Sequence, residues 1–100
     1  MDITTEEAAL AVTKWGEERQ TDMMIEEVGE FLTAWNHYKR GRISYSEYVE
    51  EIADVYIMCQ QMMIIHEEEF KKAYPKKLAK VRRKLKQVSD DSLQKLSERI

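Results

Sequence analysis

The chain has 100 residues, of which 43% are hydrophobic and 35% are charged, with three glycines, one proline and one cysteine. This composition is rich in helix-forming residues and predicts one all-α domain with a modest core. It excludes a membrane-spanning protein, because no apolar run approaches the roughly 20 residues that a bilayer requires. The single Cys59 excludes an internal disulfide framework, and the N-terminal residues do not resemble a signal peptide, so we expect a cytoplasmic protein.

Charge is distributed unevenly along the chain. Residues 1–69 hold 16 acidic and five basic residues, a net charge of −11, whereas residues 70–100 hold three acidic and 11 basic residues, a net charge of +8. Nine bases and no acids lie between Lys71 and Lys86. Such a segment binds nucleic acid, brings positive charge to an anionic substrate, or is simply a solvated helix face.

The first part of the chain predicts two helices. Thr4 begins a capping box with the glutamate three residues later, and Gly16 is the expected stop of this first helix. A polar link over residues 17–21 leads to a second helix over about 22–40, where apolar residues recur at helical spacing. The glycine at position 41 ends it.

The third predicted helix starts near residue 45, where Ser44 opens a second capping box. Because only a short turn separates the second helix from the third, the two should form an antiparallel hairpin. We expect the third helix to fray around residues 67–69. A fourth helix should cover about 70–88, with Pro75 either in its first turn or at a kink.

Ser89-Asp90-Asp91 then predicts the cap of a short tail helix over about 90–100. The predicted fold is a single all-α domain over residues 1–100, an antiparallel helical hairpin with flanking helices. It should be four-helix-bundle-like and completed by oligomerisation, since so small a helical chain often completes its core in that way.

Two acidic pairs lie on the hairpin. Glu27 and Glu30 belong to the second helix, and Glu51 and Asp54 belong to the third. Residues at i and i+3 share one helix face, so each pair points its oxygens in one direction. The hairpin places the pairs opposite each other. Four carboxylates that converge between two helices outline a site for a hard cation.

The neighbours of these acids bear on that interpretation. Val28 and Ile52 hold the same position relative to each pair, so the acids lie at one rim if both residues face a shared core. The alternative is that the carboxylates are solvated surface groups. Glu27, Glu30 and Glu51 each have an apolar residue four positions later instead of a basic one. Like-charge i,i+4 pairs such as Glu50 with Asp54 destabilise the helices. Bound Mg²⁺, or Mn²⁺ as a substitute, would compensate for this charge.

Other metal sites do not fit the sequence. A di-iron helical bundle needs Glu-x-x-His motifs, but Ala34 stands three residues before His37 and Met63 three before His66. One cysteine and two scattered histidines do not provide four zinc ligands. A carboxylate site for magnesium or manganese therefore remains.

The two acidic segments carry a family resemblance. Glu27-Val28-Gly29-Glu30-Phe31, then 20 residues between Glu30 and Glu51, then Glu50-Glu51-Ile52-Ala53-Asp54-Val55 is similar to the signature helices of the MazG-type all-α nucleoside triphosphate pyrophosphohydrolases. The resemblance covers roughly residues 10–85. It implies Mg²⁺-dependent hydrolysis of a nucleoside or deoxynucleoside triphosphate to the monophosphate and pyrophosphate, by metal-activated water attack at the α-phosphate.

The resemblance also implies roles for individual residues. It makes Glu27, Glu30, Glu51 and Asp54 the metal ligands. Glu26 or Glu27 activates the water, with no choice between the two. Lys77 and Arg82 are expected to contact phosphates, although Val81 stands where the family often has an asparagine. Trp15 is expected to contact the substrate, and Trp35 and Tyr38 either wall a base pocket or pack internally.

The expected partners are the nucleoside triphosphate and further copies of the chain, as a homodimer or homotetramer. No membrane partner is expected. The alternative function, from a different class, is a non-enzymatic helical interaction or nucleic-acid-binding module that uses the basic segment 71–86. Nucleic acid is the less favoured ligand.

Overall fold

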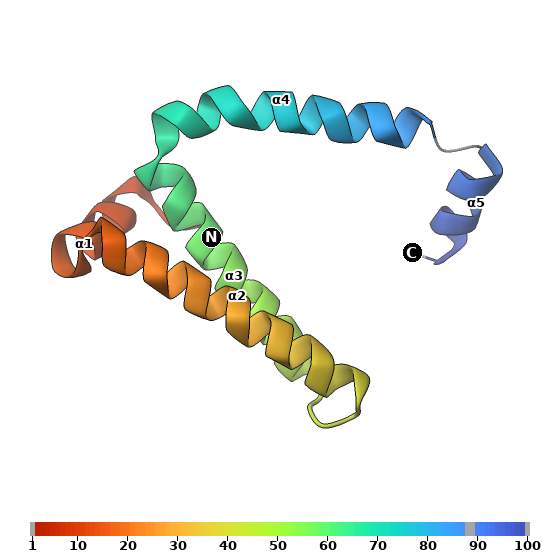
Figure 1. Cartoon of the computed structure of the whole chain (residues 1–100), viewed down its shortest axis with the longest axis horizontal. Helices are drawn as coiled ribbons and strands as arrows, with labels where there is room; N and C mark the ends of the chain where they lie inside the picture. The colour runs from red at the N-terminus through yellow and green to blue at the C-terminus, as the bar shows by residue number, and fades with distance from the viewer. Residues whose placement is uncertain (1, 88–89, 100) are drawn as a thin grey trace. The chain divides into compact units, whose positions relative to one another are not determined.

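The computed structural model describes residues 2–87 and 90–99, and these form helices with no β-strand among them. The helices, coloured along the chain in Figure 1, are α1 (Thr5–Trp15), α2 (Glu17–Lys39), α3 (Tyr45–Ile65), α4 (Glu67–Lys86) and α5 (Asp90–Arg99). The all-α prediction is confirmed. The chain divides into two units, residues 1–67 and residues 68–100.

Helix α1 begins at the predicted capping box. The Glu7 backbone N–H donates to Thr4 Oγ1 over 3.1 Å, and the Thr4 N–H donates to Glu7 Oε1 over 3.0 Å. The hydrogen bond from the Thr4 backbone is the main reason why the pKa of Glu7 lies below its ordinary value. The helix ends at Gly16, whose φ of 85° is one that glycine adopts readily.

The expected polar link over residues 17–21 is wrong, because α2 already begins at Glu17. Gly16 alone turns the chain between the two helices. Glu17 and Glu18 then occupy the first turn of α2, where negative charge is favourable. The Thr21 hydroxyl donates to the Glu17 carbonyl over 3.1 Å, so these polar residues are accommodated in the helix.

Helices α2 and α3 pack side by side as the predicted antiparallel hairpin (Figure 1). Gly41, with a φ of 70°, lies in the turn. The second capping box starts α3, since the Glu47 N–H donates to Ser44 Oγ over 3.0 Å and the Ser44 N–H donates to Glu47 Oε1 over 3.2 Å. Helix α1 packs against both members of the hairpin.

The hairpin has a narrow interior. The apolar residues that are buried in the described part of the chain are small or flexible: Ala8, Ala11, Ala34 and Met58. The condition that Val28 and Ile52 face a shared core is not met within a single chain, because they are 36% and 43% exposed. Two helices bury only the stripe along their line of contact, and these side chains lie beside that stripe.

Rings pack against one another near the turn of the hairpin. Tyr38 stacks on Tyr48 with their centroids 5.1 Å apart, and Trp35 lies 5.6 Å from the same Tyr48 ring. Phe31 also stacks on Tyr48, at 5.8 Å. Of the two alternatives for Trp35 and Tyr38, this arrangement favours packing between helices over a base pocket.

Helix α4 differs from its prediction in where it begins and in the position of Pro75. Only His66 separates it from α3, so Glu67–Glu69 form its first turn and do not fray. Pro75 lies inside the helix, so a place in the first turn is wrong, and the missing proline N–H removes one backbone hydrogen bond there.

The tail helix α5 begins at Asp90, while the predicted cap residue Ser89 lies outside the described residues. Among the helices that the structure describes, none has the length and apolar character that crossing a membrane requires.

Candidate functional site

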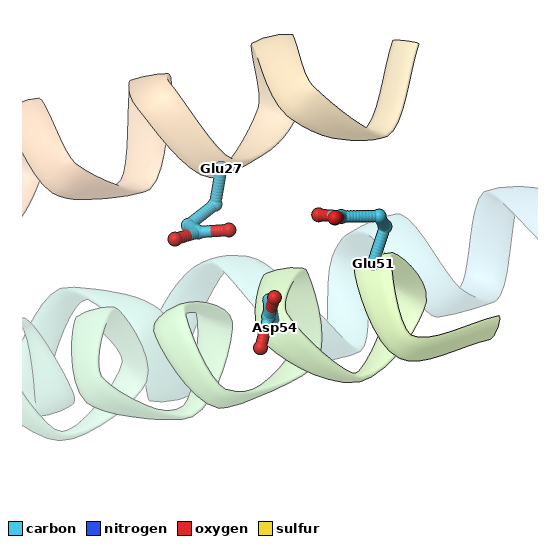
Figure 2. Close-up of side chains that lie close together, drawn as sticks. All are labelled: Glu27, Glu51 and Asp54. Carbon is cyan, nitrogen blue, oxygen red and sulfur yellow. The ribbon is translucent and has the colours of Figure 1, made fainter. Parts of the chain in front are cut away.

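Three carboxylates meet where α2 faces α3. One oxygen from each of Glu27, Glu51 and Asp54 lies within 4.8 Å of the others. Figure 2 shows the three side chains in the space between the two helices, with Glu27 reaching from α2 toward α3. The antiparallel pairing thus brings together residues that are 24 or more positions apart in the sequence. We call these three residues the acidic group.

Glu30, the fourth predicted ligand, is outside this group of three but lies next to it. Its negative charge acts on both Glu27 and Glu51 and raises the pKa of each. Its place one turn after Glu27 on α2 accounts for this proximity.

The acidic group is electrostatically strained. The pKa of Glu27 is raised above its ordinary value, first by desolvation and then by the charges of Glu30 and Asp54. The pKa of Glu51 is raised by desolvation and then by the charges of Asp54 and Glu30. Each carboxylate makes it harder for its neighbours to ionise. The ionised forms of Glu27 and Glu51 are therefore disfavoured in this arrangement.

Two oxygens of the group have no visible partner. Glu27 Oε2 and Glu51 Oε2 are both shielded from solvent, and neither has a hydrogen-bond partner within the described residues. An unpaired buried oxygen is costly, since a desolvated acceptor loses its water without replacement. The atoms of the group that could bind a metal are all carboxylate oxygens. Such ligands suit Mg²⁺ or Mn²⁺ and not a metal that prefers sulfur or imidazole. The residues present therefore fit a hard divalent cation.

An open hollow of about 620 Å³ lies beside the acidic group. We call it the acidic hollow. It is lined by Glu26, Gly29, Glu30, Thr33, Ala34, His37 and Glu51. Glu51 belongs to both the hollow and the acidic group, so a ligand in the hollow would contact the group directly.

Glu26, predicted as one of the two candidates for water activation, lines this hollow. Its carboxylate forms an ion pair with Arg19, 3.6 Å away, and both side chains are largely exposed. The sequence neighbours at i+4 did not reveal this partner, because it lies two turns earlier on the same helix face. The role of Glu26 stays a prediction.

His37 lines the hollow, although the sequence did not predict a role for it in the site. It was considered only as part of a Glu-x-x-His metal motif, which the chain lacks. The signal that could have revealed it is its spacing, seven residues after Glu30, since residues at i and i+7 share a helix face.

The remaining predicted residues lie elsewhere. Trp15 is the last residue of α1, with Lys14 Nζ 4.8 Å from the centre of its ring, and it does not line the acidic hollow. Lys77 and Arg82 lie on α4, in the second unit. The substrate contacts of all three stay predictions.

A second, smaller groove on the hairpin is entirely apolar. It has a volume of about 240 Å³ and is lined by Phe31, Ile52, Val55, Tyr56 and Cys59. We call it the apolar groove. Phe31 and Thr33 are two positions apart, a rotation of about 200° around α2, so this groove and the acidic hollow lie on different sides of the hairpin.

Comparison of the chain with known protein families, with curated proteins and with solved structures gives no match.

Proposed function

We propose that the chain is a Mg²⁺-dependent hydrolase that cleaves a nucleoside or deoxynucleoside triphosphate to the monophosphate and pyrophosphate. The observation that carries this proposal is the acidic group. Carboxylate oxygens of Glu27, Glu51 and Asp54 lie within 4.8 Å of one another, and two of the glutamate oxygens are buried without a partner in the described part of the chain. The spacing of the acidic pairs, which resembles MazG-type pyrophosphohydrolases, supports the substrate class.

Glu27, Glu51 and Asp54 would hold the cation, with Glu30 completing the set from the next turn of α2. When bound, Mg²⁺ polarises phosphoryl oxygens and lowers the pKa of a coordinated water. The carboxylates would orient the attacking water toward the α-phosphate, and Glu27 or Glu26 would accept its proton. The packing of α2 against α3 would hold these oxygens in place before substrate binds, which would reduce the reorganisation that the reaction requires.

The basic residues of α4 have a place in this proposal. A triphosphate and its departing pyrophosphate are highly anionic, so Lys77 and Arg82 would neutralise charge that the cation leaves uncompensated. Trp15 would contact the nucleoside.

A homodimer or homotetramer is part of the proposal. Few apolar residues are buried in the described part of one chain, while Val28, Leu32 and Ile52 are each at least about one-third exposed. A second copy that covers the apolar groove would remove this surface from water.

The decisive experiment measures pyrophosphate release from the eight common nucleoside and deoxynucleoside triphosphates, with and without Mg²⁺. The proposal expects Mg²⁺-dependent turnover of at least one nucleotide. It also expects loss of that turnover in Glu27→Gln and Asp54→Asn, with Glu18→Gln as a control because Glu18 is an exposed glutamate of the same helix. Absence of turnover with every nucleotide would disprove it.

The second candidate is a nucleic-acid-binding or helical interaction module. It is favoured by one observation, the nine bases and no acids between Lys71 and Lys86 on a helix with no buried residue. This function predicts salt-sensitive nucleic-acid binding that survives Asp54→Asn. Binding would be lost when Lys76, Lys77, Arg82 and Arg83 are neutralised together.

A further inference from the structure

The acidic hollow changes character along its length. At one end Glu30 and Glu51 contribute carboxylates beside the acidic group. His37 lies seven residues after Glu30, about 10 Å along the axis of α2. The hollow therefore extends from oxygen acceptors that suit a cation to an imidazole that can donate a hydrogen bond.

His37 is the one lining side chain with an N–H group among the described residues of the hollow. The hydroxyl of Thr33, halfway along, already donates to the Gly29 carbonyl over 3.2 Å. Glu26 is an acceptor that pairs with Arg19. Among the described residues that line the hollow, an anionic group at this end would therefore find its free donor at His37.

Gly29 makes room beside the hollow. It lies inside α2 and does not have a positive φ, so the backbone conformation does not require glycine there. A Cβ atom built on it would meet nothing within 4 Å. Glycine in a helix interior is destabilising relative to alanine. The physical gain at this position is open space against the helix backbone, on the side that the hollow occupies.

From these three observations we infer that the acidic hollow binds the pyrophosphate end of the substrate. The His37 imidazole donates a hydrogen bond to the terminal phosphate, and Gly29 lets the phosphate chain lie close to α2. This inference rests on the proposed function, because a polyanion enters a hollow lined with carboxylates only through a bridging cation. His37 would bind the leaving group, and the acidic motifs contain no residue that could take this role.

The test is a titration of the full-length protein with pyrophosphate in excess Mg²⁺, followed by calorimetry, which needs no turnover. His37→Leu should bind pyrophosphate about tenfold more weakly than wild type, the usual effect of losing a hydrogen bond to a charged group. His37→Gln keeps an N–H donor and should recover part of the affinity. His66→Leu is the matched control, because His66 is an exposed histidine that caps α3 and pairs with Glu17.

Gly29→Ala provides a second readout, which a structural role would not produce. The alanine should raise the thermal midpoint of unfolding and also weaken pyrophosphate binding, since the new methyl group occupies the hollow. The nucleoside monophosphate should bind wild type, His37→Leu and Gly29→Ala within twofold of one another.

Three results would overturn the inference: no binding of pyrophosphate to wild type, unchanged binding in His37→Leu, or equal weakening for monophosphate and pyrophosphate. If wild type hydrolyses a nucleotide and His37→Leu binds pyrophosphate normally, only this inference fails. If pyrophosphate binding depends on His37 but no nucleotide is hydrolysed, the hollow is a pyrophosphate site, and it is the proposed function that fails.

Discussion

The two sides of the α2–α3 hairpin differ in what would stabilise them. On the acidic side, carboxylates gather against their mutual repulsion, and two of their oxygens are buried without a hydrogen-bond partner in the described residues. On the apolar side, side chains such as Ile52 and Tyr56 are 43% and 57% exposed around the apolar groove. Charge repulsion calls for a cation, whereas exposed apolar surface calls for another surface to cover it.

Because of this difference, we expect substitutions on the acidic side to affect activity and substitutions on the apolar side to affect assembly. Removing an acid should improve the stability of the metal-free protein and abolish activity, because the acids are arranged for a ligand and not for the fold. Removing an apolar residue should change the oligomer before it changes the chemistry.

The largest expected effect is on the acidic side. Asp54→Asn should lower Mg²⁺-dependent hydrolysis by at least about 100-fold, as when one preorganised charge-stabilising group is lost. Without Mg²⁺, the same variant should have a higher thermal midpoint than wild type, because one repulsive charge is gone. Steady-state pyrophosphate release and thermal unfolding in chelator measure the two effects. A variant that loses activity and also unfolds more easily without Mg²⁺ would contradict the separation.

On the apolar side, Ile52→Asp should convert an oligomer into a single chain. A charge placed in the apolar groove would be buried without a partner at the interface, which opposes association. Light scattering after gel filtration gives the mass, and far-UV circular dichroism checks that the helices remain. Leu10→Asp is the control, since Leu10 is 68% exposed on α1. A wild-type protein with the mass of one chain would refute the assembly proposal.

The acidic group should also give a pH dependence of defined sign. Folding raises the pKa of Glu27 and Glu51, so the folded state binds these protons more tightly than the unfolded state. Their contribution to stability is fully present below the ordinary carboxyl pKa and is lost as the pH rises through the raised folded pKa.

In chelator, the thermal midpoint of Glu51→Gln should therefore gain on that of wild type as the pH rises from about 4 to about 7. Saturating Mg²⁺ should reduce this gain, because the cation compensates the wild-type charge. Parallel midpoints across this range would show that Glu51 is not strained by folding.

The smallest expected effect concerns the turn that joins α2 to α3, the two helices that carry both sides. Ser44→Ala removes the acceptor for the Glu47 N–H and should lower the free energy of unfolding by about 1 kcal/mol. Urea unfolding measures this loss, and Ser46→Ala serves as the control because Ser46 is an exposed serine within α3. A loss equal to that of the control would show that the cap contributes nothing.

Much of the secondary structure follows from local chemistry. Both capping boxes and the glycines at positions 16 and 41 are read directly from the sequence, because a cap involves residues only three positions apart. The errors at residues 17–21 and 67–69 have one cause. Polar residues were taken as helix breaks, although polar and acidic side chains are favourable in a first helical turn.

The acidic pairs themselves, and the pairing of the helices that carry them, were determined by the sequence. Only the tertiary structure decided that Glu27, Glu51 and Asp54 form the acidic group. It also decided that Glu30 lies beside this group, where its charge acts on Glu27 and Glu51, and that His37 lines the acidic hollow. It also decided that Val28 and Ile52 are exposed in one chain. Helical periodicity gives the face of a residue but not the depth to which a neighbouring helix covers that face, and this depth depends on the packing of whole elements.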